Sequence, residues 1–122
     1  MNIRKLVIPI TGSSTGGSTV YSEGFTGKVL AVAYTMGTLP NTTDIAVTLE
    51  ATTEPILTEN NIAASFVKYP RAGVHGVTGT ALTYDGSRLV TDYIHGHMDR
   101  IKVVVTDAGA ATTAGTLTVI VG

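Results

Sequence analysis

Short runs of alternating apolar and polar residues, separated by turn residues, restrict the fold of this chain more than any other feature. Residues 44–51 show the pattern most clearly, with Ile45, Val47 and Leu49 expected to face inward. No stretch keeps the 3.6-residue period of an amphipathic helix for long. Turn signals recur about every ten residues, as in sandwiches and barrels. The chain is therefore expected to be all-β: a single-domain antiparallel β-sandwich or barrel with short strands and Gly/Thr-rich loops.

Three segments carry more specific expectations about the strands. Residues 27–36 are apolar on both faces, which predicts a central strand that is covered twice. Residues 99–107 and 115–121 flank a loop of small residues and predict a closing β-hairpin. Residues 59–65 are expected to form at most one helical turn. Shorter strands are expected at 19–22, 56–58, 66–69 and 88–95, with a hairpin-type turn at Asp85-Gly86.

The N-terminal residues combine a strand with a loop. Residues 2–10 alternate, but Pro9 has no N–H to donate, so an edge strand is expected. Residues 11–19 consist of Gly, Ser and Thr and predict a flexible loop. An extended segment of this kind can add to the edge of a partner's sheet. We therefore describe residues 1–20 as a strand and loop that form a candidate docking arm, and residues 21–122 as the β-domain, within one domain overall.

The scarcity of charge indicates association with other proteins. Only 14% of the 122 residues are charged, against about 25% in ordinary globular domains. Charged residues are depleted at the cores of protein interfaces, and Thr, Gly, Val and Ala take their place here. The alternative is a monomer whose many Thr hydroxyls keep it in solution. We favour a surface that other subunits cover.

Charge and composition also exclude several classes of function. A formal net charge of -1 with scattered Lys and Arg argues against binding to nucleic acid. The chain has no cysteine, so disulfides and thiol chemistry are excluded. No apolar run approaches the length of a membrane helix, and the run Leu6–Ile10 is too short for a signal peptide. Neither a nucleic acid nor a membrane is expected as a partner.

His95 and His97 are the strongest candidates for chemistry in the chain. Residues i and i+2 of a strand share a face, so both imidazoles could bind one metal ion, with Asp92 or Asp99 as a third ligand. The alternative is a pair of exposed or interface histidines near a strand end, with Gly96 loosening the geometry. We favour this alternative, because His-x-His pairs are common by chance. No acid/base pair or nucleophile elsewhere in the chain has a catalytic spacing either. The chain is expected not to be an enzyme and to hold no metal or cofactor.

Three stretches of the chain resemble a family of small proteins encoded among the head genes of tailed bacteriophages. They are residues 27–34, residues 69–86, and residues 99–105 with 115–121, so the resemblance covers most of 25–122. The most specific element is Tyr-Pro-Arg-Ala-Gly-Val-His from Tyr69, followed by Asp-Arg-Ile-Lys-Val-Val-Val from Asp99.

The resemblance implies a virion structural protein, made in the host cytoplasm and located on the capsid exterior. It implies a capsid decoration (cement) protein that forms homo-oligomers, often trimers, and binds the major capsid protein. The alternatives are a head-fibre base, a tail component or a receptor-binding module.

The expected interface residues come from two parts of the chain. Tyr69 and Arg71 are one group, since Tyr and Arg are enriched at interface hot spots; alternatively, Tyr69 fills the core and Arg71 only points outward. Ile3, Arg4 and Leu6 of the N-terminal strand are the other group.

Overall fold

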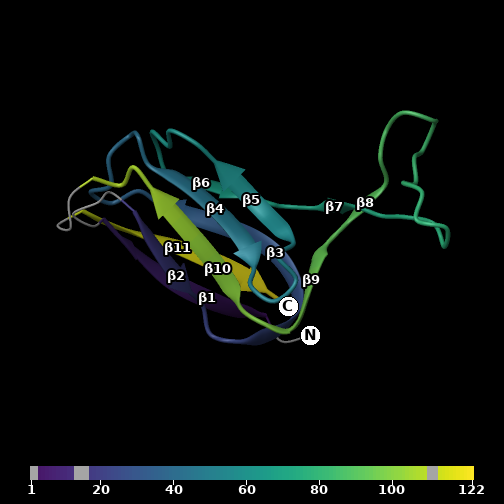
Figure 1. Ribbon diagram of the computed structural model, residues 1–122, viewed down its shortest axis with the longest axis horizontal. Helices are drawn as coiled ribbons and strands as arrows, with labels where there is room; N and C mark the ends of the chain where they lie inside the picture. The colour runs from purple at the N-terminus through teal and green to yellow at the C-terminus, as the bar shows by residue number, and fades with distance from the viewer. Residues whose placement is uncertain (1–2, 13–16, 110–112) are drawn as a thin grey trace.

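The computed structural model describes residues 3–12, 17–109 and 113–122 and confirms the all-β prediction (Figure 1). The described residues form strands, turns and loops and contain no helix. The strands are β1 (Arg4–Thr11), β2 (Ser18–Tyr21), β3 (Phe25–Thr35), β4 (Asp44–Leu49), β5 (Pro55–Glu59), β6 (Phe66–Lys68), β7 (Ala72–Gly73), β8 (Thr91–Asp92), β9 (Ile94–Asp99), β10 (Ile101–Thr106) and β11 (Ala114–Val121).

Two antiparallel sheets form the body of the molecule. The five-stranded sheet has the order β1-β11-β3-β6, and β9 pairs with β3 as well; the four-stranded sheet has the order β2-β10-β4-β5. The sheets are linked at both margins. Ser18 Oγ of β2 donates a hydrogen bond of 3.1 Å to the Thr11 carbonyl of β1, and Lys68 of β6 pairs with Glu59 of β5. The result is a curled, half-closed sandwich.

The core fills the space between the sheets and follows the predicted alternation. Ile45, Val47 and Leu49 are buried, as predicted from residues 44–51. The same period places Ile8 of β1 and Leu117 of β11 inside, with exposed or half-buried residues between them. The largest fully buried side chains are Tyr34, Leu6, Ile8, Ile10, Ile45, Leu49, Ile94, Ile101 and Leu117.

Two strand positions agree with the sequence-based expectations. Strand β1 lies at the edge of the five-stranded sheet and pairs with β11 on one side. The N–H that Pro9 lacks is therefore not needed to pair with a strand on the other side. Strand β3 lies inside the same sheet, between β11 on one side and β6 and β9 on the other. Its second face is only partly covered, since Ala31 is buried there whereas Leu30 and Ala33 remain half-buried. The second covering expected for residues 27–36 is therefore incomplete in the single chain.

The predicted closing hairpin is wrong. Strand β10 pairs with β2 and β4, whereas β11 pairs with β1 and β3, so the two strands lie in opposite sheets. Both strands have an apolar residue at every second position. Each takes an inner position in its own sheet, where it pairs with a strand on both sides. The chain therefore crosses from one sheet to the other between Thr106 and Ala114 rather than turning within one.

The helical turn considered for residues 59–65 is also absent. Asn61 has a positive φ of 50°, and its N–H donates to Asp44 Oδ1 at 2.8 Å. The next residue, Ile62, donates its N–H to the Thr43 carbonyl at 3.0 Å and is buried in the core. These contacts with the chain around β4 hold the segment as a loop, because burial of Ile62 outweighs a short helix with few hydrogen bonds.

Candidate functional site: a forked arm

A long excursion of the chain leaves the body between β6 and β9 (Figure 1). We call residues 72–92 the forked arm. Its stem is the two-stranded pairing of β7 with β8, in which Ala72 lies opposite Asp92 and Gly73 opposite Thr91. Beyond the stem the chain projects away from both sheets of the body (Figure 1). The strand expected at 88–95 is thus divided: residues 88–92 belong to the arm, and β9 starts at Ile94.

The arm divides at a three-way backbone junction. The N–H of Val74 donates to the carbonyl of Val90, the N–H of Val90 donates to the carbonyl of Leu82, and the N–H of Leu82 donates to the carbonyl of Val74. Each of these hydrogen bonds is 3.0 Å long. Each of the three residues donates one of these bonds and accepts another, so the ring of hydrogen bonds is closed. Two hairpins, residues 74–82 and 82–90, diverge from this ring.

The first hairpin is short and rich in glycine. His75 forms a bridge with Ala81, and the N–H of Gly76 donates to the Thr80 carbonyl at 2.9 Å. The turn closes through the N–H of Gly79, which has a positive φ of 84°. A side chain at this position would be strained, which explains why glycine stands here.

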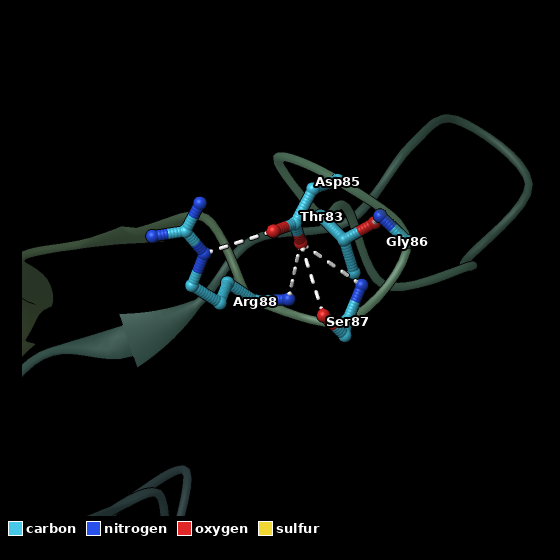
Figure 2. Close-up of polar contacts among 5 residues, drawn as sticks. All are labelled: Thr83, Asp85, Gly86, Ser87 and Arg88. Carbon is cyan, nitrogen blue, oxygen red and sulfur yellow. Dashed lines mark hydrogen bonds and ion pairs between the residues drawn. The ribbon is translucent and has the colours of Figure 1, made fainter.

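The second hairpin ends in a turn built around one carboxylate (Figure 2). Asp85 Oδ1 accepts hydrogen bonds from the N–H groups of Ser87 (3.1 Å) and Arg88 (2.9 Å) and from Ser87 Oγ (3.1 Å). Asp85 Oδ2 pairs with Arg88 Nε at 2.9 Å. The N–H of Gly86 donates to Thr83 Oγ1 at 3.1 Å. The predicted turn at Asp85-Gly86 is confirmed.

These contacts change the acidity of the turn. The pKa of Asp85 is lowered from 3.8 to about 2, chiefly because the N–H groups of Arg88 and Ser87 and the Arg88 guanidinium stabilise the ionised carboxylate. The charge of Asp85 is thus satisfied within the arm. The tip is ordered by local polar contacts alone.

No side chain of residues 74–91 is buried, although several are large and apolar. Tyr84 is 73% exposed and Leu89 52% exposed, on the strands that flank the Asp85 turn. Val77 and Leu82 of the first hairpin are exposed as well. This part of the arm therefore exposes large apolar side chains and covers no core of its own.

The root of the arm is fixed to the body by stacked cations. The Arg71 guanidinium lies 4.0 Å from the centre of the Tyr93 ring, and Lys28 Nζ of β3 lies 5.3 Å from it. Arg71 Nη1 also donates to the carbonyls of Pro70 (2.8 Å) and Leu30 (3.3 Å). The arm therefore leaves the body in a defined direction.

The two predicted interface residues of this region have different environments. Tyr69 is exposed and stands beside the root, so it does not fill the core. Arg71 is occupied by the contacts with Tyr93 and Leu30 and positions the arm. Whether either residue contacts a partner stays a prediction.

The three predicted interface residues of the N-terminal strand do not form one surface. Ile3 is exposed, and Arg4 forms a 3.5 Å ion pair with Glu23 at the surface. Leu6 is buried in the core, and this part of the prediction is wrong, because inward-facing positions of β1 complete the sandwich. Residues 1–2 and 13–16 of the predicted docking arm lie outside the described residues. The part that is described contributes β1 and β2 to the two sheets.

His95 and His97 share an exposed face of β9, with ring centroids 6.3 Å apart. The proposed third ligands are otherwise engaged: Asp99 Oδ1 accepts from the N–H groups of Ala51 (3.0 Å) and Arg100 (2.8 Å), and Asp92 Oδ1 accepts from that of Tyr93 (2.7 Å). Among the described residues, no three His, Asp or Glu side chains are grouped to hold a metal ion. The two rings line an open hollow under the arm root, together with Leu49, Ala51, Thr52, Glu54, Ala72, Gly73, Val74, Tyr93 and Asp99.

The chain matched nothing in comparisons with protein-family models, curated proteins and solved structures. Nor does the described part of the chain contain a helix that is long and apolar enough to cross a membrane.

Sequence patterns do not identify the arm residues Tyr84, Asp85 and Leu89 or the root residue Tyr93 as a site. One signal was present: turn residues at Gly73, Gly76, Gly79 and Asp85-Gly86 lie too close together for the strands of a core.

Proposed function

We propose that this chain is a virion structural protein of a tailed bacteriophage: a capsid decoration protein that forms homo-oligomers and binds the lattice of the major capsid protein. The observation that carries the proposal is the forked arm, which is held in a defined direction and covered by no other described part of the chain. The resemblance of residues 27–34, 69–86, 99–105 and 115–121 to phage head proteins supports the class of particle.

The composition of the surface supports assembly rather than catalysis. With 14% charged residues, the chain can be covered by neighbours without the desolvation of many ions. A decoration protein makes several weak contacts at once, and their simultaneous engagement gives tight binding. A rigid β body with a projecting apolar element is suited to such contacts.

Binding to heads tests this function directly. Purified protein is mixed with phage heads assembled without it, and the bound fraction is measured after sedimentation. We expect saturable binding at a fixed ratio to the major capsid protein, visible as added density on the outer shell by electron microscopy. Density on the tail instead would show another virion component, and failure to bind any part of the particle would refute the proposal.

A further inference from the structure

The outer face of the five-stranded sheet is the second uncovered apolar surface of the molecule. Its central row runs across four strands: Val7 lies opposite Thr118, Thr118 opposite Ala33, and Ala33 opposite Val67. Val7 is 61% exposed and Val67 56% exposed. We call these four residues the outer row. None of them is charged, and the neighbours of Val7, Ala33 and Thr118 along β1, β3 and β11 point into the core.

We propose that the forked arm of one copy docks on the outer row of a second copy. The inference rests on the self-association that is part of the proposed function. It assigns the arm and the sheet face as the two halves of one head-to-tail contact.

The root of the arm prevents the same contact within one chain. Arg71 is held between Tyr93 and the carbonyl of Leu30, and the arm projects away from the body (Figure 1). The arm would have to release these contacts to fold back on its own sheet. A second copy can accept it without any such change.

The charges of the two surfaces are compatible with this contact. Between Gly73 and Thr91 the charged residues are Asp85 and Arg88, which pair with each other at 2.9 Å. The outer row carries no charge that would lose its water. Docking therefore buries apolar and hydroxyl groups on both sides, while Lys5, two residues from Val7 on the same exposed face of β1, stays at the polar rim of the interface.

The size of the arm also fits an interface with a single partner. An arm of about 20 residues offers the number that one side of a standard protein interface contributes. In a closed ring of head-to-tail contacts the arm and the outer row of each copy are both covered, whereas a foreign partner on the arm would leave the outer row exposed. Contacts of this type close into a ring when the rotation between copies permits it.

Two defective variants and their mixture test the assignment. Tyr84→Ser with Leu89→Ser removes the apolar side chains of the arm, and Val7→Lys places a charge in the outer row. Thr58→Lys is the matched control, since Thr58 is exposed on the outer face of the four-stranded sheet. Circular dichroism and thermal unfolding verify that each variant folds, as expected for substitutions of exposed side chains.

Oligomeric state is then measured by sedimentation velocity over a range of concentrations. We expect the arm variant and the outer-row variant each to raise the dissociation constant by roughly 30-fold or more, as for hot-spot residues, and the control to behave as wild type. Mixed together, the two defective variants should form a one-to-one dimer, because one retains an intact arm and the other an intact outer row.

Absence of this dimer, or an outer-row variant that assembles as wild type does, would overturn the head-to-tail assignment. The measurement uses no phage heads, so it separates the two proposals. Normal self-association by these variants would refute the inference alone, and an oligomer of the expected kind that binds no head would refute the proposed function alone.

Discussion

The acidic residue at the tip of the arm is the clearest case of one side chain that determines local structure. Asp85 accepts hydrogen bonds from two backbone N–H groups, one hydroxyl and one guanidinium, and all of these favour its ionised form. Because the pKa of Asp85 in the folded chain is about 2 and its ordinary value is 3.8, its contribution to order is complete above pH 3.8. That contribution is lost as the pH falls through about 2.

This linkage predicts a local acid transition in the arm. We expect the amide resonances of Ser87 and Arg88 to titrate together with a midpoint near pH 2, followed by NMR. Asp85→Asn keeps an acceptor oxygen but has no proton to gain, so the same amides should show no transition there. A midpoint near pH 4 in the wild type would contradict the account.

The close approach of Gly96 to a buried ring predicts that a side chain at this position would disturb the packing. A Cβ at this position would collide with the ring of Phe25, which is buried in the core. Gly96→Ala should lower the free energy of unfolding by about 1–3 kcal/mol, the usual cost of overpacking, measured by urea denaturation. Gly24→Ala is the control, since its nearest neighbour would be the Asp99 carbonyl at 3.9 Å. Equal stability of both variants would contradict the close approach.

At the scale of the element, the forked arm and the body differ in what stabilises them. Strands β3 and β11 are stabilised by burial on their inner faces, whereas the arm depends on backbone hydrogen bonds around Val74, Leu82 and Val90. Hydrogen bonds that remain open to solvent contribute little net stability. The orientation of the arm therefore depends on its root.

The root contact predicts a change that is confined to the arm. Tyr93→Ala removes the ring that both Arg71 and Lys28 contact. We expect faster hydrogen exchange across residues 72–92 and a loss of less than about 1 kcal/mol in the stability of the body. Exchange is measured by mass spectrometry, with Tyr69→Ala as the matched loss of an exposed ring. Unchanged exchange in the arm would show that Tyr93 does not hold it.

At the scale of the whole molecule, the scarcity of charge predicts how assembly responds to salt. Apolar contacts are not screened, whereas interactions between exposed ions weaken as salt is added. The self-association constant should stay the same or rise between about 50 mM and about 500 mM NaCl, measured by light scattering after size-exclusion chromatography. Dissociation on adding salt would instead indicate an interface held by ion pairs.

Much of the body could be predicted from the sequence. The alternation of Ile45, Val47 and Leu49 determines which side chains are buried, because a strand places every second residue on the same face. Pro9 identifies β1 as an edge strand, since it cannot join two ladders. The Asp85-Gly86 pair identifies its turn by its own chemistry.

Only the tertiary structure decided which strands are neighbours and which segment leaves the body. Strands β10 and β11 have equally apolar inner faces, and no feature of their local sequence shows that they belong to opposite sheets. Similarly, Leu82, Tyr84 and Leu89 have the composition of buried residues, and their exposure follows from the three-way junction that carries them outward. Periodicity is a property of a few consecutive residues, whereas pairing and burial depend on every other segment that competes for the same core.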